Sequence, residues 1–320
     1  NILYIIYIKI IFNCAYFSFH KQYCQNIKKE LEKLGHIAII TESRDSCNLS
    51  ATDIENKYII EHNDADFTIL PDEACKIIGG KGIYINHALL PVLPENHKFK
   101  SEHSFYYSLN YKNALESYSD YLFLPSQEIA NIFTKELNIN KPIKIVGFPK
   151  LDDIIISRKN KKQNNQFNII YLPTGNWKKT MNSENIIDFN ILNNMGNFIY
   201  NGHPSVDKKN VASNKLLEIA DILITDYSSI GYDAIVLNIP TIFIDSPHWK
   251  TDSYKSSLIC ETSRNAGIRV TNMNELILAI EKYKKNPSFL EDKRIYYGNL
   301  LSKYKENSSE IFVKELLKLL

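Results

Sequence analysis

The segment from residue 220 to residue 233 reads ADILITDYSSIGYD. Its first half, Asp221–Thr225, is a short apolar run that predicts a buried β-strand, and Ser229–Leu237 predicts a helix directly after it. A serine at a helix start can satisfy unpaired backbone N–H groups, and the same N–H groups attract anions. We therefore expect an anion site formed by Asp226 and the Ser228–Ser229 pair, with plain helix capping as the structural alternative.

Strands and helices alternate along the whole chain, which favours parallel sheets with helices on both faces. The other predicted strands are Ile8–Asn13, His36–Thr41, Phe67–Leu70, Gly82–Asn86, Tyr121–Leu124, Ile143–Val146, Phe167–Leu172, Phe198–Tyr200 and Thr241–Ile244. The other predicted helices are Lys21–Leu34, Asp53–His62, Gln127–Leu137, Asn214–Ala220 and Asn274–Tyr283, with further helix up to Leu320. A chain of 320 residues has room for two domains of ordinary size.

A polar and basic stretch, Ser157–Gln166, reads SRKNKKQNNQ and has no apolar periodicity. It is the predicted domain boundary, with a long surface loop inside one domain as the alternative. We expect an α/β fold with two Rossmann-like parallel-sheet lobes, 1–156 and 167–320, that face a central cleft. The C-terminal helices are expected to be able to pack back on the N-terminal lobe.

The composition argues against several classes of protein. Thirty-eight basic residues nearly balance 36 acidic ones, and the net charge of +2 gives no reason to expect a nucleic-acid partner. The five cysteines are widely spread and contain no CxxC pair. This pattern argues against a zinc site and against a disulfide framework, and it favours the reduced thiols of a cytosolic protein.

The first residues of the sequence, Asn1–Phe19, are mostly apolar and resemble a membrane segment at first sight. Lys9 interrupts the run, and its apolar residues are largely β-branched or aromatic, whereas a membrane span needs about 20 cleanly apolar residues. Buried strands therefore explain this region better than insertion into a bilayer.

Polar residues that follow other predicted strands are the remaining candidates, because ligands of open α/β sheets bind beyond the carboxyl ends of the strands. Thr174 can hydrogen-bond a ligand or cap a turn. His203, in Gly202-His203-Pro204, can neutralise a diphosphate or protonate a leaving phosphate, and His87 can act as a general base toward an acceptor hydroxyl. Each of these residues, taken alone, also has an ordinary structural explanation.

Several segments, taken in their order along the chain, resemble motifs of the CDP-glycerol glycerophosphotransferase family, which contains the teichoic-acid primases and polymerases. The matching motifs are Asn86-His87 with Pro91, Leu124-Pro125-Ser126, Gly147-Phe148-Pro149-Lys150-Leu151-Asp152, Tyr171-Leu172-Pro173-Thr174, Gly202-His203-Pro204, Asp221–Ser229 with Asp233, Glu261, and Glu275-Leu276. The Thr-Asp-Tyr-Ser-Ser element at 225–229 is the most specific of these. The resemblance covers roughly residues 80–285.

The resemblance implies a GT-B fold in which the C-terminal lobe binds the nucleotide donor and the N-terminal lobe lies on the acceptor side. The implied reaction transfers glycerol phosphate, or a related polyol phosphate, from a CDP-linked donor to a hydroxyl of a cell-surface glycan or lipid-linked acceptor, and releases CMP. His87 would be the base, and His203 would hold the phosphates together with Ser228 and Ser229. Thr174, Asp226 and Asp233 would complete the donor site.

The same resemblance implies that neither a metal ion nor a cofactor other than the donor is required. It places the protein in the cytoplasm, peripherally at the inner face of the cytoplasmic membrane, in the synthesis of teichoic acid, capsule or other cell-wall polymers. Two alternatives remain open at this point. One is a GT-B glycosyltransferase that uses a nucleotide sugar for surface polysaccharide synthesis, and the other is an inactive nucleotide-binding module.

Overall fold

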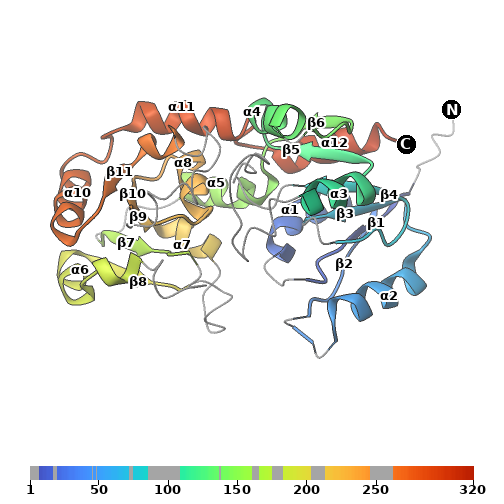
Figure 1. Ribbon diagram of the computed structural model, residues 1–320, viewed down its shortest axis with the longest axis horizontal. Helices are drawn as coiled ribbons and strands as arrows, with labels where there is room; N and C mark the ends of the chain where they lie inside the picture. The colour runs from blue at the N-terminus through green and yellow to red at the C-terminus, as the bar shows by residue number, and fades with distance from the viewer. Residues whose placement is uncertain are drawn as a thin grey trace. The chain divides into compact units, whose positions relative to one another are not determined.

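The computed structural model describes residues 7–16, 20–44, 46–47, 49–71, 75–85, 109–136, 138–160, 166–174, 183–202, 213–245 and 262–320. These residues form two compact units (Figure 1). Within the described ranges, unit 1 combines 7–85, 109–152 and Lys303–Leu320, and unit 2 comprises Asp153–Ser302. Each unit has one parallel sheet with helices packed against it.

Unit 1 contains a six-stranded sheet in the order β2-β1-β3-β4-β5-β6, and all of its neighbouring strands are parallel. The strands are β1 (Lys9–Phe12), β2 (Ile37–Ile40), β3 (Phe67–Leu70), β4 (Lys81–Ile85), β5 (Tyr121–Leu124) and β6 (Ile143–Ile145). The helices are α1 (His20–Lys33), α2 (Ala51–His62), α3 (Leu109–Tyr118), α4 (Gln127–Asn131, continued by the π-helical turn Ile132–Glu136), the 3-10 turn Pro149–Leu151 and α12 (Ser308–Leu317).

Helices cover both faces of the first sheet, which explains why its strands are apolar on both sides. Cys24, Ile27 and Leu31 of α1 pack with Phe312 of α12 against one face, and the aromatic rings of Phe123 and Phe312 lie 4.8 Å apart. On the other face, Ile54 and Tyr58 of α2 pack around Ile11. The C-terminal segment is therefore part of the core of unit 1.

Unit 2 contains a five-stranded parallel sheet in the order β11-β10-β9-β7-β8. The strands are β7 (Asn168–Tyr171), β8 (Asn197–Tyr200), β9 (Ile222–Thr225), β10 (Thr241–Ile244) and β11 (Ile268–Val270). The helices are α5 (Asp152–Lys159, which begins at the last residue of unit 1), the 3-10 turn Ser183–Ile186, α6 (Phe189–Met195), α7 (Ser213–Ile219), α8 (Ile230–Val236), the 3-10 turn Arg264–Ala266, α10 (Met273–Lys285) and α11 (Glu291–Leu301).

The α/β fold with two parallel-sheet units is confirmed, and every predicted strand is present with its ends within one residue of the predicted ends. The strand β11 was not predicted, because Arg269 interrupts its short apolar run. The helix α5 runs into the polar stretch that begins at Ser157. Arg158 from that stretch donates to the carbonyl oxygens of Leu217 and Ala220 at 2.8 and 2.9 Å, so it caps the end of α7.

The apolar N-terminal run contains the strand β1, which lies between β2 and β3 and in which Ile10, Ile11 and Phe12 are fully buried. This confirms the predicted strand at Ile8–Asn13. Among the described residues, no helix combines the length and the apolar character that a bilayer span requires.

Candidate functional site

The site in unit 2 lies where the order of the strands reverses. From β7 the chain first adds β8 on one side, and it later adds β9 on the other side of β7. The loops that follow β7 and β9 therefore diverge at the carboxyl edge of the sheet, which is where open α/β sheets bind their ligands. The register pairs Tyr171 with Ile224, so Thr174 and Asp226 emerge next to each other although 52 residues separate them.

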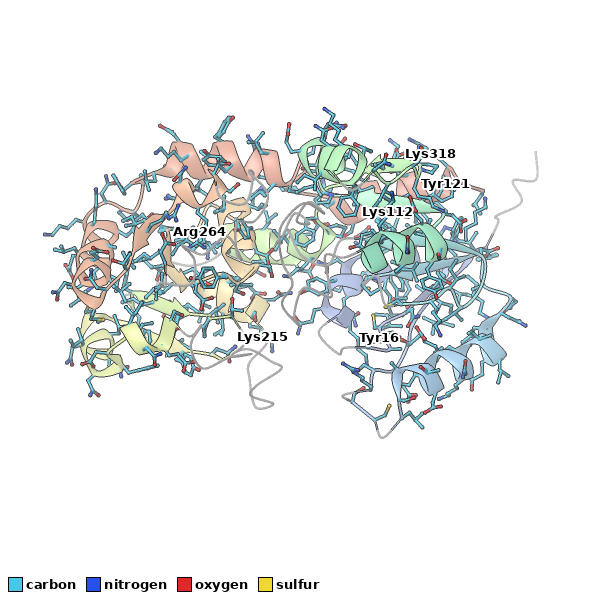
Figure 2. The ribbon with its side chains drawn as sticks, viewed as in Figure 1. Tyr16, Lys112, Tyr121, Lys215, Arg264 and Lys318 are labelled. Atoms are coloured by element: carbon cyan, nitrogen blue, oxygen red, sulfur yellow. The ribbon has the colours of Figure 1, made fainter. Side chains whose placement is uncertain are left out.

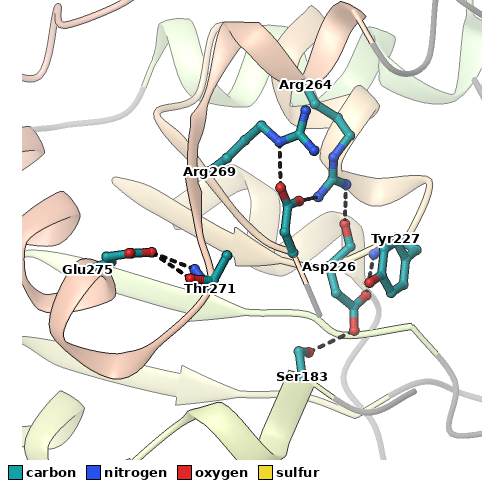
Figure 3. A network of polar contacts seen from close by, with 8 residues as sticks. Ser183, Asp226, Tyr227, Arg264, Arg269, Thr271 and Glu275 are labelled. Carbon is teal, nitrogen blue, oxygen red and sulfur yellow. Dashed lines mark hydrogen bonds and ion pairs between the residues drawn. The ribbon is translucent and has the colours of Figure 1, made fainter. Parts of the chain in front are cut away.

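Asp226 joins these two loops. Its Oδ1 accepts hydrogen bonds from the backbone N–H of Thr174 at 2.7 Å and of Tyr227 at 2.6 Å. Its Oδ2 accepts a hydrogen bond from the hydroxyl of Ser183 at 2.7 Å (Figure 3). The side chain is 1% exposed. Asp226 therefore shapes the loop, and its carboxylate oxygens face protein donors.

The buried Tyr171 stabilises this arrangement through Ser183. The hydroxyl groups of Tyr171 and Ser183 lie 2.6 Å apart. Because the hydroxyl of Ser183 donates to Asp226, Tyr171 donates to Ser183. Burial raises the pKa of Tyr171 far above its usual value, and the negative charge of Asp226 raises it further. Tyr171 thus keeps its proton and remains a hydrogen-bond donor at any physiological pH.

The Ser228–Ser229 pair that follows contains hydrogen-bond donors for which the described part of the chain provides no partner. Both residues are half-buried, and the hydroxyl of Ser229 makes no capping bond to α8. The hydroxyl of Ser228 lies 3.5 Å from the N–H of Ile230, which is long for such a bond. Within the described part of the chain, no hydrogen bond uses the backbone N–H of either serine. Helix capping therefore does not account for the pair, and the cluster of donors suits an anion.

Two further predicted residues lie near this loop but differ in their surroundings. Thr174 is half-buried, and its buried hydroxyl has no hydrogen-bond partner among the described residues. Asp233 lies in the first turn of α8 and is completely buried. Gly231 lies in the same helix as Asp233, and a Cβ atom at Gly231 would come within 2.6 Å of the ring of Phe243. The missing side chain therefore allows α8 to approach the sheet closely.

The two predicted histidines, His87 and His203, lie outside the described residues. The described chain reaches Ile85 at the end of β4 in unit 1 and Gly202 just beyond the end of β8 in unit 2. Both roles remain predictions.

The sequence analysis missed Arg264, Ser183 and Asp245. Arg264, labelled in Figure 2, belongs to unit 2 and is completely buried, and its Nη1 donates to the backbone oxygen of Asp226 at 2.6 Å. Arginine side chains are mostly exposed, so a single arginine in a short turn gave no signal in the sequence. Ser183 carried no signal either, because it begins a short 3-10 turn and belongs to no periodic pattern. Among the described residues, no group of three or more His, Cys, Asp or Glu side chains is arranged to hold a metal ion.

The sequence model of one protein family, CDP-glycerol:poly(glycerophosphate) glycerophosphotransferase, matches residues 95–318, which is more than half of the chain. The chain belongs to this family. The matched range includes Thr174, His203 and the 226–229 loop, and His87 lies before it. No curated protein sequence matches the chain.

Solved structures to which the chain is similar show that it has the GT-B fold. The wall teichoic acid polymerase TagF is similar, with a TM-score of 0.68 and 16% identity over 97% of this chain and 88% of the other. S. aureus MnaA in a co-structure with UDP has a TM-score of 0.62 and 15% identity over 98% of both chains. A UDP-GlcNAc 2-epimerase from Neisseria meningitidis has a TM-score of 0.60 and 14% identity over 98% of this chain and 100% of the other. At these identities the likeness concerns the fold alone.

Proposed function

We propose that this enzyme transfers glycerol phosphate, or a related polyol phosphate, from a CDP-linked donor to a hydroxyl of a cell-surface glycan or lipid-linked acceptor and releases CMP. The observation that carries the proposal is the set of unused donors at Ser228–Ser229, which lies at the strand-order reversal of unit 2. Such a position is where an open α/β sheet receives a nucleotide, and N–H and O–H groups suit its phosphates.

The proposed chemistry is a displacement at the β-phosphorus of the donor. The acceptor oxygen forms a bond to this phosphorus, and the bond from the phosphorus to the bridging oxygen breaks, so that the bridging oxygen leaves with CMP. His87 takes the proton of the acceptor hydroxyl, and His203 compensates the charge of the phosphates. Such transfers depend mainly on positioning and on fixed dipoles and charges, and the 226–229 loop is well suited to this role.

Two further observations support the proposal. The family to which the chain belongs is defined by glycerophosphate transfer from CDP-glycerol. One of the similar TagF structures was obtained after a soak with CDPG, and it has a TM-score of 0.67 to this chain. The acceptor of such a reaction is membrane-bound or polymeric, so we propose that the enzyme works peripherally at the inner face of the cytoplasmic membrane.

The test is release of CMP by the purified protein when it is supplied with CDP-glycerol and a lipid-linked or soluble glycan acceptor. We expect acceptor-dependent CMP that disappears in the His87→Ala variant. Release of a nucleoside diphosphate from a nucleotide sugar would instead identify a glycosyltransferase. Tight binding of CDP without turnover of any donor would identify an inactive binding module.

A further inference from the structure

Arg264 connects two loops at the carboxyl edge of the second sheet. Its Nη1 donates to the backbone oxygen of Asp226, which follows β9, and its Nη2 forms an ion pair of 2.5 Å with Asp245, which follows β10. The guanidinium carbon lies 4.4 Å from the ring centre of Phe243 and 5.7 Å from that of Tyr227. Planar guanidinium groups combine directional bonds with stacking in this way, and lysine cannot reproduce the arrangement.

Asp245 is itself held in place from the opposite side. Its backbone N–H donates to the oxygen of Val270 at 2.7 Å. Its Oδ2 accepts a hydrogen bond of 2.6 Å from Arg269, whose side chain is 31% exposed, whereas that of Arg264 is not exposed at all (Figure 3). The two arginines therefore share one carboxylate, and Arg264 also donates a hydrogen bond to the backbone oxygen of Asp226 in the 226–229 loop (Figure 3).

A buried charge is costly unless nearby groups compensate it, so the position of Arg264 calls for an explanation beyond packing. The loop that carries the unused donors also carries the carboxylate of Asp226, and Asp245 adds a second carboxylate to the network. An incoming diphosphate would be repelled by these negative charges if no cation balanced them. Arg264 contacts both residues and supplies a positive charge that is always present.

We propose that Arg264 is a positioning residue of the donor site: it fixes the backbone at Asp226 so that the N–H and O–H groups of Ser228 and Ser229 face the donor phosphates, and it balances the carboxylates of Asp226 and Asp245. This inference rests on the proposed function of the same loop. Arg264 acts through the loop, and none of its contacts assigns it a direct bond to the donor.

The first test compares Arg264→Gln with Arg269→Gln, because both variants remove one arginine from Asp245 and the first also removes the hydrogen bond to the backbone oxygen of Asp226. We expect the dissociation constant of CDP, measured by calorimetry well below the unfolding temperature, to rise at least about tenfold in Arg264→Gln and less than about threefold in Arg269→Gln. Arg264→Lys should restore part of the affinity. Equal affinity in all three variants and the wild type would overturn the inference, and so would equal losses in both glutamine variants.

Two additional measurements keep the test decisive if Arg264→Gln does not fold. Asp245→Asn weakens the ion pair of the Arg264 guanidinium, while the Arg264 side chain still fills its buried position. This variant should also raise the dissociation constant of CDP. Amide hydrogen exchange without any ligand should become faster at Tyr227, Gly231 and Tyr232 in Arg264→Lys and Asp245→Asn, and it should stay unchanged in Arg269→Gln. Unchanged exchange and affinity in both variants would overturn the inference.

These measurements separate the inference from the proposed function. A wild-type protein that binds neither CDP nor CDP-glycerol would contradict the proposed function, and the ligand-free exchange experiment would still decide whether Arg264 positions the loop. A wild-type protein that binds CDP with an affinity independent of Arg264 would contradict the inference alone.

Discussion

Two pairs of adjacent serines, Ser308–Ser309 in unit 1 and Ser228–Ser229 in unit 2, stand at the start of a helix and near an aspartate that accepts three hydrogen bonds. Asp152 receives the N–H groups of Ser308 and Ser309, at 3.2 and 2.7 Å, and the hydroxyl of Ser309, at 2.7 Å. Asp226 receives the N–H groups of Thr174 and Tyr227 and the hydroxyl of Ser183.

The difference between the pairs lies in the donors of the serines themselves. Ser308 and Ser309 are 1% and 3% exposed, and Asp152 engages both of their N–H groups. The hydroxyl of Ser308 is engaged as well, since the N–H of Phe148 donates to it at 3.1 Å. Ser228 and Ser229 are half-buried, and their aspartate is bound by other residues. The first pair therefore holds α12 in unit 1, whereas the backbone N–H groups of the second pair have no partner among the described residues.

Replacement of the two aspartates should give the largest contrast. Asp226→Ala leaves three donors without an acceptor, so we expect the donor loop to relax and kcat/KM for CDP-glycerol to fall by about 100-fold or more. Asp152→Ala should destabilise the fold by about 2–4 kcal/mol, since it leaves a similar set of buried donors unpaired, and kcat/KM should change less than about threefold. Steady-state kinetics and urea unfolding of both variants measure this. Similar losses of activity in the two variants would contradict the comparison.

Replacement of the serines should separate binding from stability. In Ser228→Ala/Ser229→Ala, the loss of two hydroxyl donors to charged phosphates should weaken CDP binding by about 10- to 100-fold and leave the unfolding temperature nearly unchanged. The matched variant Ser308→Ala/Ser309→Ala should unfold at a temperature lower by several degrees and bind CDP normally. Calorimetry and thermal unfolding provide both readouts. The account fails if the second variant loses more CDP affinity than the first.

Replacement of the glycines beside the two loops should give a smaller contrast. Gly147 has a φ of 77°, and a Cβ atom there would lie 2.3 Å from the hydroxyl oxygen of Ser308. Gly147→Ala and Gly231→Ala should each lower stability by about 1–3 kcal/mol through crowding and, at Gly147, through backbone strain. Only Gly231→Ala, which displaces α8, should also weaken CDP binding. Normal binding by a folded Gly231→Ala variant would show that the position of α8 does not affect the loop.

The smallest expected effect is a dependence of the free energy of unfolding on pH through Asp152. Burial raises the pKa of Asp152 above its usual value of 3.8, and the hydrogen bonds from Ser309 and Ser308 oppose this only in part. The folded protein then binds this proton more tightly than the unfolded chain, so the contribution of Asp152 to stability falls as pH rises upward from about 3.8. Relative to Asp152→Asn, the wild type should lose stability as the pH rises above about 3.8. A difference in urea midpoints that stays constant or grows with pH would contradict this.

The sequence predicted the two sheets well, because strands that are buried on both faces appear as continuous apolar runs such as Ile222–Thr225. The family resemblance placed Asp226 and Thr174 in one expected donor site, and the structure brings the two into contact, because the backbone N–H of Thr174 donates to Asp226. The sequence could not distinguish the two serine pairs, because the partners of Asp152 are more than 150 residues away along the chain. Arg264 was missed because a single arginine in a short turn carries no pattern, and only the fold brings it to Asp226.

The most direct test of the donor site is amide hydrogen exchange at Ser228 and Ser229 with and without CDP-glycerol. The account predicts fast exchange at both amides in the free protein and marked slowing when the donor binds. It also predicts no change at Ser308 and Ser309, whose N–H groups are already bound to Asp152. Binding of CDP-glycerol without slower exchange at Ser228 and Ser229 would show that the donor phosphates are held elsewhere and would contradict the central claim.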